Sequence, residues 1–352
     1  MTQKPLPKAA SPEYLTGVLR KSLVDVRVCD VVVESSHATI LSEITRLRPI
    51  YESEASGAPR TIILKTGHPD RLGDASWDAG RQEVAFYNEV AAAKPDRQLL
   101  RCFEAAWDSD TRAWHLLLED LTDTHFIATA WPLPPTQEQC ENILRARARF
   151  HAAWWDDPRL GESVGAWQDE AAMRESLKRF EEKLSLFTDR FGDRLPSERR
   201  KLFQRLIDAG LRLHTHHRSH RNMTIVQGDS HVWNSFLPRD GGNDVRLFDW
   251  DCWRVDVAAD DLAYMLAVHW YPDRRRRMER PLLDCYHAEL MENGVTGYDR
   301  AALFEDYRLA VLWQATTPIW QAMSNMPPVI WWNNLERIFL AVDDLDCQEL
   351  LD

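Results

Sequence analysis

Short stretches of apolar and β-branched residues, separated by polar segments, recur in the first 120 positions, a pattern that favours strands. Val26–Val33 is rich in valine, and Ile40–Leu47 alternates apolar with polar side chains. Thr61–Leu64 is a short apolar stretch rich in β-branched residues. Two further strands are expected at Leu99–Trp107 and Trp114–Leu118, on either side of a polar turn. We therefore predict an antiparallel sheet in this part of the chain.

Helical periodicity dominates the remainder, so the predicted fold class is α+β. Ser11 is a suitable N-cap for the first helix, because its hydroxyl can accept a hydrogen bond from the first turn. Residues 1–10 are polar and contain proline, and we expect them to be a disordered lead. The helices expected from the pattern are Pro12–Lys21, Trp77–Ala93, Thr136–Trp155, Asp169–Phe191 and Ser197–Leu213.

Three polar residues between positions 225 and 266 combine chemistry with a suggestive spacing. Asp229 follows a short apolar strand, Thr224–Val226, and Asn234 lies five positions further on. Asp249 ends a second apolar strand, Val245–Phe248, after a turn rich in Gly, Asn and Asp. A hairpin formed by these two strands would bring the three side chains into one small region.

Asp and Asn in this arrangement suit phosphoryl transfer. Their oxygens are hard ligands of the kind that hold Mg²⁺ on ATP phosphates. A catalytic Asp, an Asn five residues later and a second, metal-binding Asp are the parts that protein kinases use. We therefore assign Asp229 as the proton acceptor, and Asn234 and Asp249 as metal ligands. The alternative is a surface hairpin whose acidic side chains are only solvated.

Three motifs in order resemble the aminoglycoside phosphotransferase and choline kinase-like superfamily: Gln227–Asp229 with Asn234, Asp249–Asp251, and Asp261–Ala263. The resemblance implies a bilobal protein-kinase-like fold, with a nucleotide-binding N-lobe at 1–120 and a mainly helical C-lobe at 121–352. It also implies that Asp261 is a structural residue near the catalytic loop.

Farther along, the sequence around Leu282–Val295 and at Tyr307-Arg308 resembles the ecdysteroid-kinase-like subgroup. Gln227 departs from the superfamily, which most often has His there, but Gln can also donate and accept hydrogen bonds. We expect His151 to be structural, and we assign no chemical role to His231.

The resemblance also implies the nucleotide contacts. Lys65 ends the third strand and would neutralise the α- and β-phosphates of ATP, with Glu83 on the next helix as its ion-pair partner. Glu89 is the rival partner, but it lies on another helix face. The alternative is an exposed Lys at a strand end and a solvated Glu.

A loop over the phosphates is expected at 34–39, between the first two strands. It contains no glycine, so we expect the hydroxyls of Ser35, Ser36 and Thr39 to act as donors in place of a closely approaching backbone. Hydroxyl-bearing turns without any ligand are the alternative reading. Backbone groups near Glu119 and Leu121 would bind adenine at a hinge.

Composition narrows the choice of partners. The net charge of −12 argues against nucleic acid, which needs a basic surface. There is no apolar run of about 18 residues, so no membrane span is expected.

The six cysteines are scattered, without CxxC spacing, and predict reduced thiols in a cytoplasmic protein. Four histidines lie within 214–220, with a spacing that matches no usual zinc site, and we expect a solvated helix end. The sequence does not define an oligomeric state.

Two features bear on the acceptor. Asp261 follows Asp249 by only twelve residues, which leaves no room for the activation segment of a protein kinase. We therefore predict a small-molecule kinase that uses ATP and Mg²⁺ and phosphorylates a hydroxyl group. Positions 307–335 contain four Trp and no Asp or Glu, which favours a partly apolar, neutral or singly charged acceptor over an aminoglycoside. The alternatives are an aminoglycoside or macrolide phosphotransferase and a non-catalytic nucleotide-binding pseudokinase.

Overall fold

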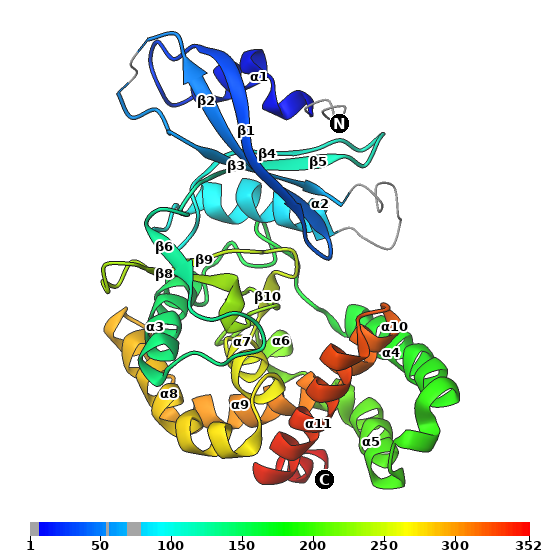
Figure 1. The fold of residues 1–352 in the computed structure, drawn as a ribbon. Helices are drawn as coiled ribbons and strands as arrows, with labels where there is room; N and C mark the ends of the chain where they lie inside the picture. The colour runs from blue at the N-terminus through cyan, green and yellow to red at the C-terminus, as the bar shows by residue number, and fades with distance from the viewer. Residues whose placement is uncertain (1–6, 54–55, 69–78) are drawn as a thin grey trace. The chain divides into compact units, whose positions relative to one another are not determined.

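The computed structural model describes residues 7–53, 56–68 and 79–352. The chain forms two compact units (Figure 1). The sheet unit comprises Met1–Phe126 and Pro238–Cys252, and the helical unit comprises Ile127–Leu237 and Trp253–Asp352. The α+β class predicted from the sequence is confirmed. Asp249 thus belongs to the sheet unit, although it follows most of the helical unit in sequence.

The sheet unit is built on a five-stranded antiparallel sheet with the order β1-β2-β3-β5-β4. All five strands were predicted, with shifts of a few residues at their ends. The strands are β1 (Val28–Ala38), β2 (Ser42–Tyr51), β3 (Ile62–Gly67), β4 (Cys102–Trp107) and β5 (Trp114–Glu119).

Helix α1 (Pro12–Leu19) begins where the sequence predicts it to begin. The Ser11 hydroxyl accepts a hydrogen bond from the N–H of Tyr14 at 3.2 Å, and α1 packs against β1. A short 3₁₀-helix, η1 (Lys8–Ala10), precedes it and buries Ala9 and Ala10 in the core. The prediction of a disordered lead is therefore wrong for residues 8–10, because these small apolar side chains join the core. Residues 1–6 lie outside the described residues.

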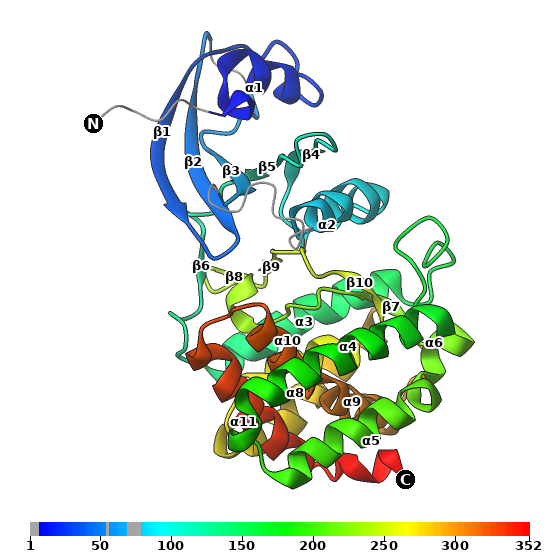
Figure 2. The same cartoon turned by 90° about the vertical axis from the view of Figure 1, so that its right-hand side faces the viewer.

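The second helix of the sheet unit packs against β4 and β5 (Figure 2). It is described as α2 (Ala79–Ala85), which continues as a π-helix, η3 (Phe86–Ala91). Trp77 and Asp78, the predicted first residues of this helix, lie outside the described residues. The Phe86 ring stacks on the buried Trp250 ring at a centroid distance of 4.0 Å, which fixes the segment beside Asp249 to this helix.

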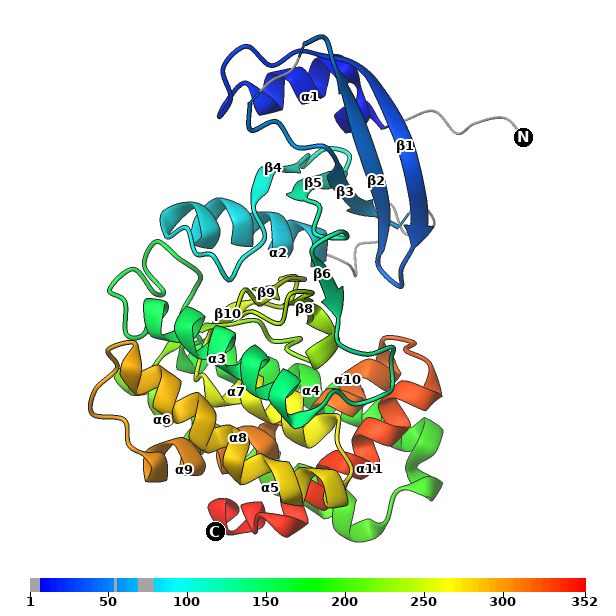
Figure 3. The ribbon, with the colours of Figure 1, turned by 60° about the vertical axis from the view of Figure 1, so that its left-hand side comes forward.

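In the helical unit, α3 and α8 run side by side (Figure 3). The three long helices predicted from periodicity, which are α3, α4 and α5, are confirmed within one residue at each end. Among the helices in the described ranges, none combines the length and apolar character needed for a membrane span. The helices of this unit are α3 (Gln137–Trp154), α4 (Glu170–Phe191), η4 (Gly192–Arg194), α5 (Ser197–Leu213), α6 (Thr215–Ser219), η5 (Val232–Asn234), α7 (Ala259–Ala263), η6 (Tyr264–Val268), α8 (Pro272–Glu292), α9 (Arg300–Gln314), α10 (Thr317–Met323), α11 (Pro328–Asp344) and η7 (Cys347–Leu351).

The strand before Asp229 has a different partner from the predicted one. Strand β7 (Thr224–Val226) pairs with β10 (Arg254–Asp256), and not with the strand before Asp249. The hairpin expected between those two strands is therefore wrong, because the chain returns to β7 only after Asp249. The remaining short strands are β6 (His125–Ile127), β8 (Ser235–Pro238) and β9 (Arg246–Leu247).

Candidate functional site

In the sheet unit, Lys65 lies between two carboxylates. Its Nζ is 2.6 Å from Glu83 Oε2 and 2.6 Å from Asp249 Oδ1. Lys65 is 8% exposed and Glu83 1% exposed, because β3 and α2 bury both side chains. The predicted Lys65–Glu83 ion pair is present, and Glu89, the rival partner, is exposed.

Lys65 lies in a strongly acidic environment. Burial alone would lower the pKa of Lys65, but the carboxylates of Asp249, Glu83 and Asp251 raise it above its ordinary value. Among the described residues, Lys65 thus shares its surroundings with three carboxylates, an environment that suits a bound cation. Asp249 is about one third exposed, and its φ of +68° is a conformation that non-glycine residues seldom adopt. Such backbone strain is often found at functional positions.

The predicted hinge begins at the end of β5. The N–H of Glu119 donates to the carbonyl of Arg101, so it is committed to the sheet. The Glu119 carboxylate accepts hydrogen bonds from the N–H of Arg101 and from Arg246 Nη1, both at 2.8 Å. The N–H of Leu121 has no acceptor among the described residues, so of these two N–H groups only that of Leu121 could serve a ligand.

The segment predicted as a phosphate loop is mostly strand. Strand β1 continues to Ala38, so Ser35 and Ser36 face Arg46 and Thr45 on β2 and do not lie in a loop. The loop prediction is therefore wrong in position, because cross-strand pairing extends through the two serines to a turn at 39–41. The Ser36 hydroxyl is hydrogen-bonded to Glu43 Oε1 (3.1 Å) and Thr45 Oγ1 (3.0 Å).

In the helical unit, Asp229 lies in the turn between β7 and η5. Asn234 Nδ2 donates to the backbone carbonyl of Asp229 at 2.8 Å and lies 3.2 Å from its Oδ2. These contacts fix the amide and leave Asn234 Oδ1 as the atom that can act as a metal ligand. The Asp229 side chain is 29% exposed, which a base that meets an incoming substrate requires.

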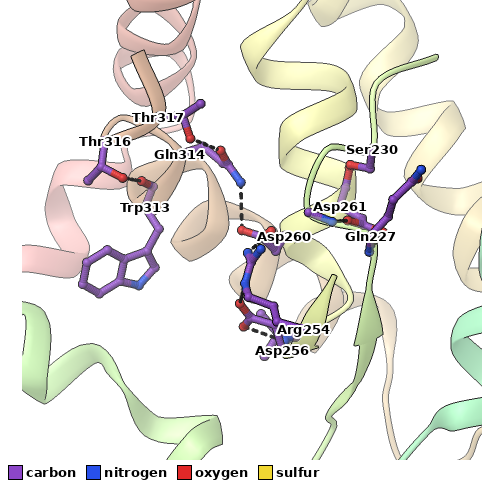
Figure 4. A network of polar contacts seen from close by, with 12 residues as sticks. Gln227, Ser230, Arg254, Asp256, Asp260, Asp261, Trp313, Gln314, Thr316 and Thr317 are labelled. Atoms are coloured by element: carbon purple, nitrogen blue, oxygen red, sulfur yellow. Dashed lines mark hydrogen bonds and ion pairs between the residues drawn. The ribbon is translucent and has the colours of Figure 1, made fainter. Parts of the chain in front are cut away.

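The backbone before Asp229 is held by Asp261 at the start of the helical segment α7–η6. Asp261 Oδ2 accepts from the N–H of Gln227 (3.0 Å) and Oδ1 from the N–H of Gly228 (2.9 Å). The Ser230 hydroxyl donates to the Asp261 carbonyl at 2.8 Å (Figure 4). Gly228 has φ +81°, where a side chain would be strained. Asp261 thus shapes the loop that presents Asp229, as the resemblance implied.

Asp261 is itself held by two basic side chains. Its Oδ2 lies 2.6 Å from Arg147 Nη1 and 3.2 Å from His151 Nε2. Burial alone would raise the pKa of Asp261, but Arg147 and His151 lower it well below its ordinary value. Burial lowers the pKa of His151, which accepts at Nδ1 from the Tyr286 hydroxyl at 2.8 Å. His151 is therefore structural, as predicted.

Gln227 fills the position where the superfamily most often has His. Its side-chain oxygen accepts from Arg147 Nη2 at 2.9 Å, and its N–H donates to Asp261. Gln227 thus joins the same buried network through both its side chain and its backbone, so the fold accommodates Gln at this position.

An aromatic cluster adjoins Asp229, and the sequence did not predict it. His231 Nε2 lies 3.5 Å from Asp229 Oδ2, and the His231 ring packs edge-on against the rings of Trp233 and His269. Tyr264 on η6 packs against both histidines. Burial lowers the pKa of His269 well below its ordinary value, and nearby His231 and Arg337 add to this effect. The only sequence signal for this cluster was that His231 lies two residues after Asp229.

The histidines at 214–220 do not form a solvated helix end. His214 and His217 are buried and stack at a centroid distance of 4.0 Å. His216 Nε2 lies 2.7 Å from Asp306 Oδ1, and His217 Nε2 lies 3.1 Å from Asp256 Oδ1. The prediction of solvation is therefore wrong for these three residues, because each has a carboxylate or carbonyl partner on another element.

Within the described ranges, no group of three or more His, Cys, Asp or Glu side chains is arranged to hold a metal ion. The predicted ligand set is of another kind, one amide oxygen from Asn234 and one carboxylate from Asp249. Hard oxygens of this type suit Mg²⁺, which usually keeps several waters and phosphate oxygens in its shell. The donor chemistry of the residues present therefore fits this ion.

Comparison with known proteins gives one family match and several similar structures. Residues 38–295 match the ecdysteroid kinase-like family. Among curated proteins, none matches the chain. A candidate aminoglycoside phosphotransferase from Ralstonia eutropha has a similar structure, with a TM-score of 0.58 at 14% identity, over 96% of this chain and 98% of that chain.

Two further solved structures are kinases of amino alcohols. The choline kinase LicA from Streptococcus pneumoniae has a TM-score of 0.52 at 12% identity, over 95% of this chain and 98% of that chain. The ethanolamine kinase from Plasmodium vivax has a TM-score of 0.54 at 10% identity, over 93% and 87%. These likenesses confirm the predicted protein-kinase-like fold.

Proposed function

Because the chain belongs to the ecdysteroid kinase-like family, we propose that it transfers the γ-phosphoryl group of ATP to a hydroxyl group of a small molecule, with Mg²⁺ as cofactor. The class of enzyme, a small-molecule kinase with an alcohol acceptor, follows from the family. The observation that carries the proposal is the loop of Asp229, in which Asn234 is hydrogen-bonded to the proposed base and Asp261 holds the backbone.

Lys65 is the proposed contact to the α- and β-phosphates, and Glu83 holds it in place. The side chain is already oriented by two carboxylates and remains charged, so little ordering is needed when a nucleotide binds. Leu121 is the proposed donor to adenine, through its unused N–H, and Glu119 ends the strand that places it. Ser35 remains a proposed phosphate-side donor. LicA, which shares the fold, has been solved in complex with AMP.

Asn234 and Asp249 are the proposed Mg²⁺ ligands. When bound, Mg²⁺ neutralises phosphate charge and polarises the transferred group. The chain contributes the Oδ1 of Asn234, whose amide nitrogen is held by Asp229, and the exposed carboxylate of Asp249. Lys65 keeps that carboxylate oriented through its 2.6 Å contact.

Asp229 is the proposed general base. Its carboxylate would accept the proton of the acceptor hydroxyl as the oxygen attacks phosphorus, which contributes roughly 10²–10⁴-fold for a positioned base. Asn234 and His231 both lie near Oδ2, so the carboxylate has a fixed orientation toward the acceptor.

The acceptor is proposed to be partly apolar and neutral or singly charged, and not an aminoglycoside. The aromatic cluster of His231, Trp233, Tyr264 and His269 supports this choice, because it presents ring surface beside the base. A polycationic acceptor would need several carboxylates at that position, and among the described residues of the cluster there is none. All six cysteines are free thiols, which supports the cytoplasm as the compartment.

The deciding experiment is an ATP-consumption screen with Mg²⁺ against steroids, amino alcohols, hydroxylated metabolites and antibiotics, with Asp229→Asn as the blank. We expect a signal with partly apolar alcohols that disappears in the blank. A signal with kanamycin-like compounds alone would support an aminoglycoside phosphotransferase. ATP binding without phosphorylated product across the panel would support a pseudokinase.

A further inference from the structure

The helical unit contains a cavity of about 340 Å³ that the proposed reaction does not use. Helices α4, α5, α6, α9 and α10 surround it, together with β10 and the start of α7. The described residues that line it do not include residues 227–235, so Asp229 and its loop are outside the cavity. Its size is within the range of small-molecule sites.

One end of the cavity is polar and carries surplus negative charge. Arg254 lies between two carboxylates, with Nε 2.8 Å from Asp256 Oδ2 and Nη2 2.5 Å from Asp260 Oδ2. Gln314 Nε2 donates to Asp260 Oδ1 at 2.8 Å, and the Thr317 hydroxyl donates to Gln314 at 2.6 Å (Figure 4). Two acids thus face one guanidinium, and no lysine is among the described residues that line the cavity.

His217 adds a hydrogen-bond acceptor at the same end. It is 8% exposed, and its Nε2 lies 3.1 Å from Asp256 Oδ1, so the Nε2–H is used there. In that tautomer Nδ1 is an acceptor, and this buried atom has no partner among the described residues. A buried acceptor without a donor is costly, and a ligand that brings an N–H would satisfy it.

The other end is apolar and aromatic. The half-buried Trp313 and Trp320 line it, and Trp313 belongs to the acid-free stretch noted in the sequence. Trp320 already accepts a cation on its face, since Lys183 Nζ lies 5.2 Å from the ring centroid. Indole faces attract cations and also pack against flat rings.

We propose that this cavity is a second binding site, for a protonated amine that carries an aromatic or other flat apolar body. The ammonium group is held between Asp260, Asp256 and His217, and the body lies against Trp313 and Trp320. The site is separate from the acceptor position, although Asp260 and Asp261 are consecutive on α7 and face the cavity and the catalytic loop respectively (Figure 4).

The test uses tryptamine as the probe, with 3-ethylindole as its neutral analogue, and measures binding to the full chain by calorimetry at pH 8. We expect tryptamine to bind at least tenfold more tightly than 3-ethylindole, and equally well to Asp229→Asn. Asp260→Asn should weaken the binding of tryptamine at least tenfold. Asp189 is an exposed acid on α4, so Asp189→Asn should leave the affinity for tryptamine unchanged. Equal binding of the two probes, or loss of binding in Asp229→Asn, would overturn the proposal.

The pH dependence supplies a second readout. Burial raises the pKa of Asp260 to about 6, where Arg254 opposes the shift and Asp256 and Asp261 add to it. Tryptamine should therefore bind more tightly as the pH rises through about 6, and this trend should be lost in Asp260→Asn. If the trend persists there, the assignment to Asp260 is wrong. If Asp260→Asn does not fold, Trp313→Leu should still lower affinity at least tenfold, and unchanged affinity in it would overturn the site.

Discussion

The two groups of acidic residues in this chain differ in how their carboxylates are used. In the helical unit, Asp261 is fully buried, and its oxygens accept from Arg147, His151 and two backbone N–H groups. In the sheet unit, Asp249 is about one third exposed and is held by Lys65. The first arrangement is saturated by its partners, whereas the second keeps part of its carboxylate accessible to solvent.

This difference distinguishes carboxylates that stabilise the backbone from carboxylates that are proposed to take part in the reaction. A buried carboxylate that is saturated by partners rigidifies the backbone that donates to it. A carboxylate at the end of a buried ion-pair cluster keeps its orientation and can still meet a metal or a proton. Asp229 resembles Asp249 in this respect, because Asn234 orients its carboxylate and its side chain remains 29% exposed. The following variants test this division in order of expected effect.

Asp261→Asn should have the largest effect on stability. The change leaves Arg147 buried without its charge partner, and breaking a buried pair in this way costs about 3–5 kcal/mol in the free energy of unfolding. Chemical denaturation of wild type and variant measures it. Exposed Asp343→Asn, which breaks the surface pair with Arg199, is the control and should cost about 1 kcal/mol or less. Equal losses in the two variants would contradict a supporting role for Asp261.

The stabilisation by Asp261 should also depend on pH. Its pKa is lowered in the folded state, so its contribution is fully present above the unfolded value of about 3.9 and is lost as pH falls toward the folded pKa. The stability difference between wild type and Asp261→Asn should therefore be constant from pH 5 to 8 and shrink below about pH 4. A difference that instead grows on acidification would contradict the assignment.

Asp229→Asn should have the next largest effect, and on turnover only. Removing the proposed base should lower kcat by roughly 10²-fold or more, while Mg–ATP binding and thermal stability stay close to wild type. Single-turnover kinetics with any acceptor from the screen, together with calorimetric ATP titration, separate the two. Unchanged turnover would place the base elsewhere.

Glu83→Gln should mainly affect nucleotide affinity. Lys65 would lose one of its two 2.6 Å partners and turn toward Asp249, away from its position for phosphate. We expect the KM for ATP to rise about tenfold, equivalent to about 1.4 kcal/mol, with a smaller change in kcat. Glu89→Gln on the same helical segment is the matched control and should leave KM unchanged. An equal effect in both variants would argue for a general loss of helix stability.

The sequence predicted best where the pattern is local or the motif is specific. The five strands, the α1 N-cap and the three long helices follow from periodicity and capping residues. The fold followed from three motifs in order, and the family followed from the sequence around Leu282–Val295 and at Tyr307-Arg308. Both predictions are confirmed. The Lys65–Glu83 pair followed from the same template and is present in the structure.

Long-range pairing was not predictable in the same way. The partner of β7 is β10, which could not be inferred because a three-residue strand carries no register information of its own. The solvated reading of His214, His216 and His217 was wrong because their partners, such as Asp306 and Asp256, come from remote helices and strands. His231 and His269 are 38 positions apart, so their contact has no local signal. The roles of the site residues and the lobe boundary at 120 and 121 stay predictions.

The smallest expected effect distinguishes the two serines of β1. Ser36 bonds across the sheet to Thr45 and Glu43, whereas the Ser35 hydroxyl has no partner among the described residues. Ser36→Ala should therefore cost about 0.2–1 kcal/mol of stability, the value of a cross-strand pair, and leave the KM for ATP unchanged. Ser35→Ala should leave stability unchanged and raise this KM about threefold, because only a free hydroxyl can donate to phosphate at no cost to the sheet. Thermal unfolding and ATP kinetics on both variants decide it. The reverse pattern would show that Ser36 leaves its strand partners for the nucleotide, and that this edge of the sheet serves a ligand.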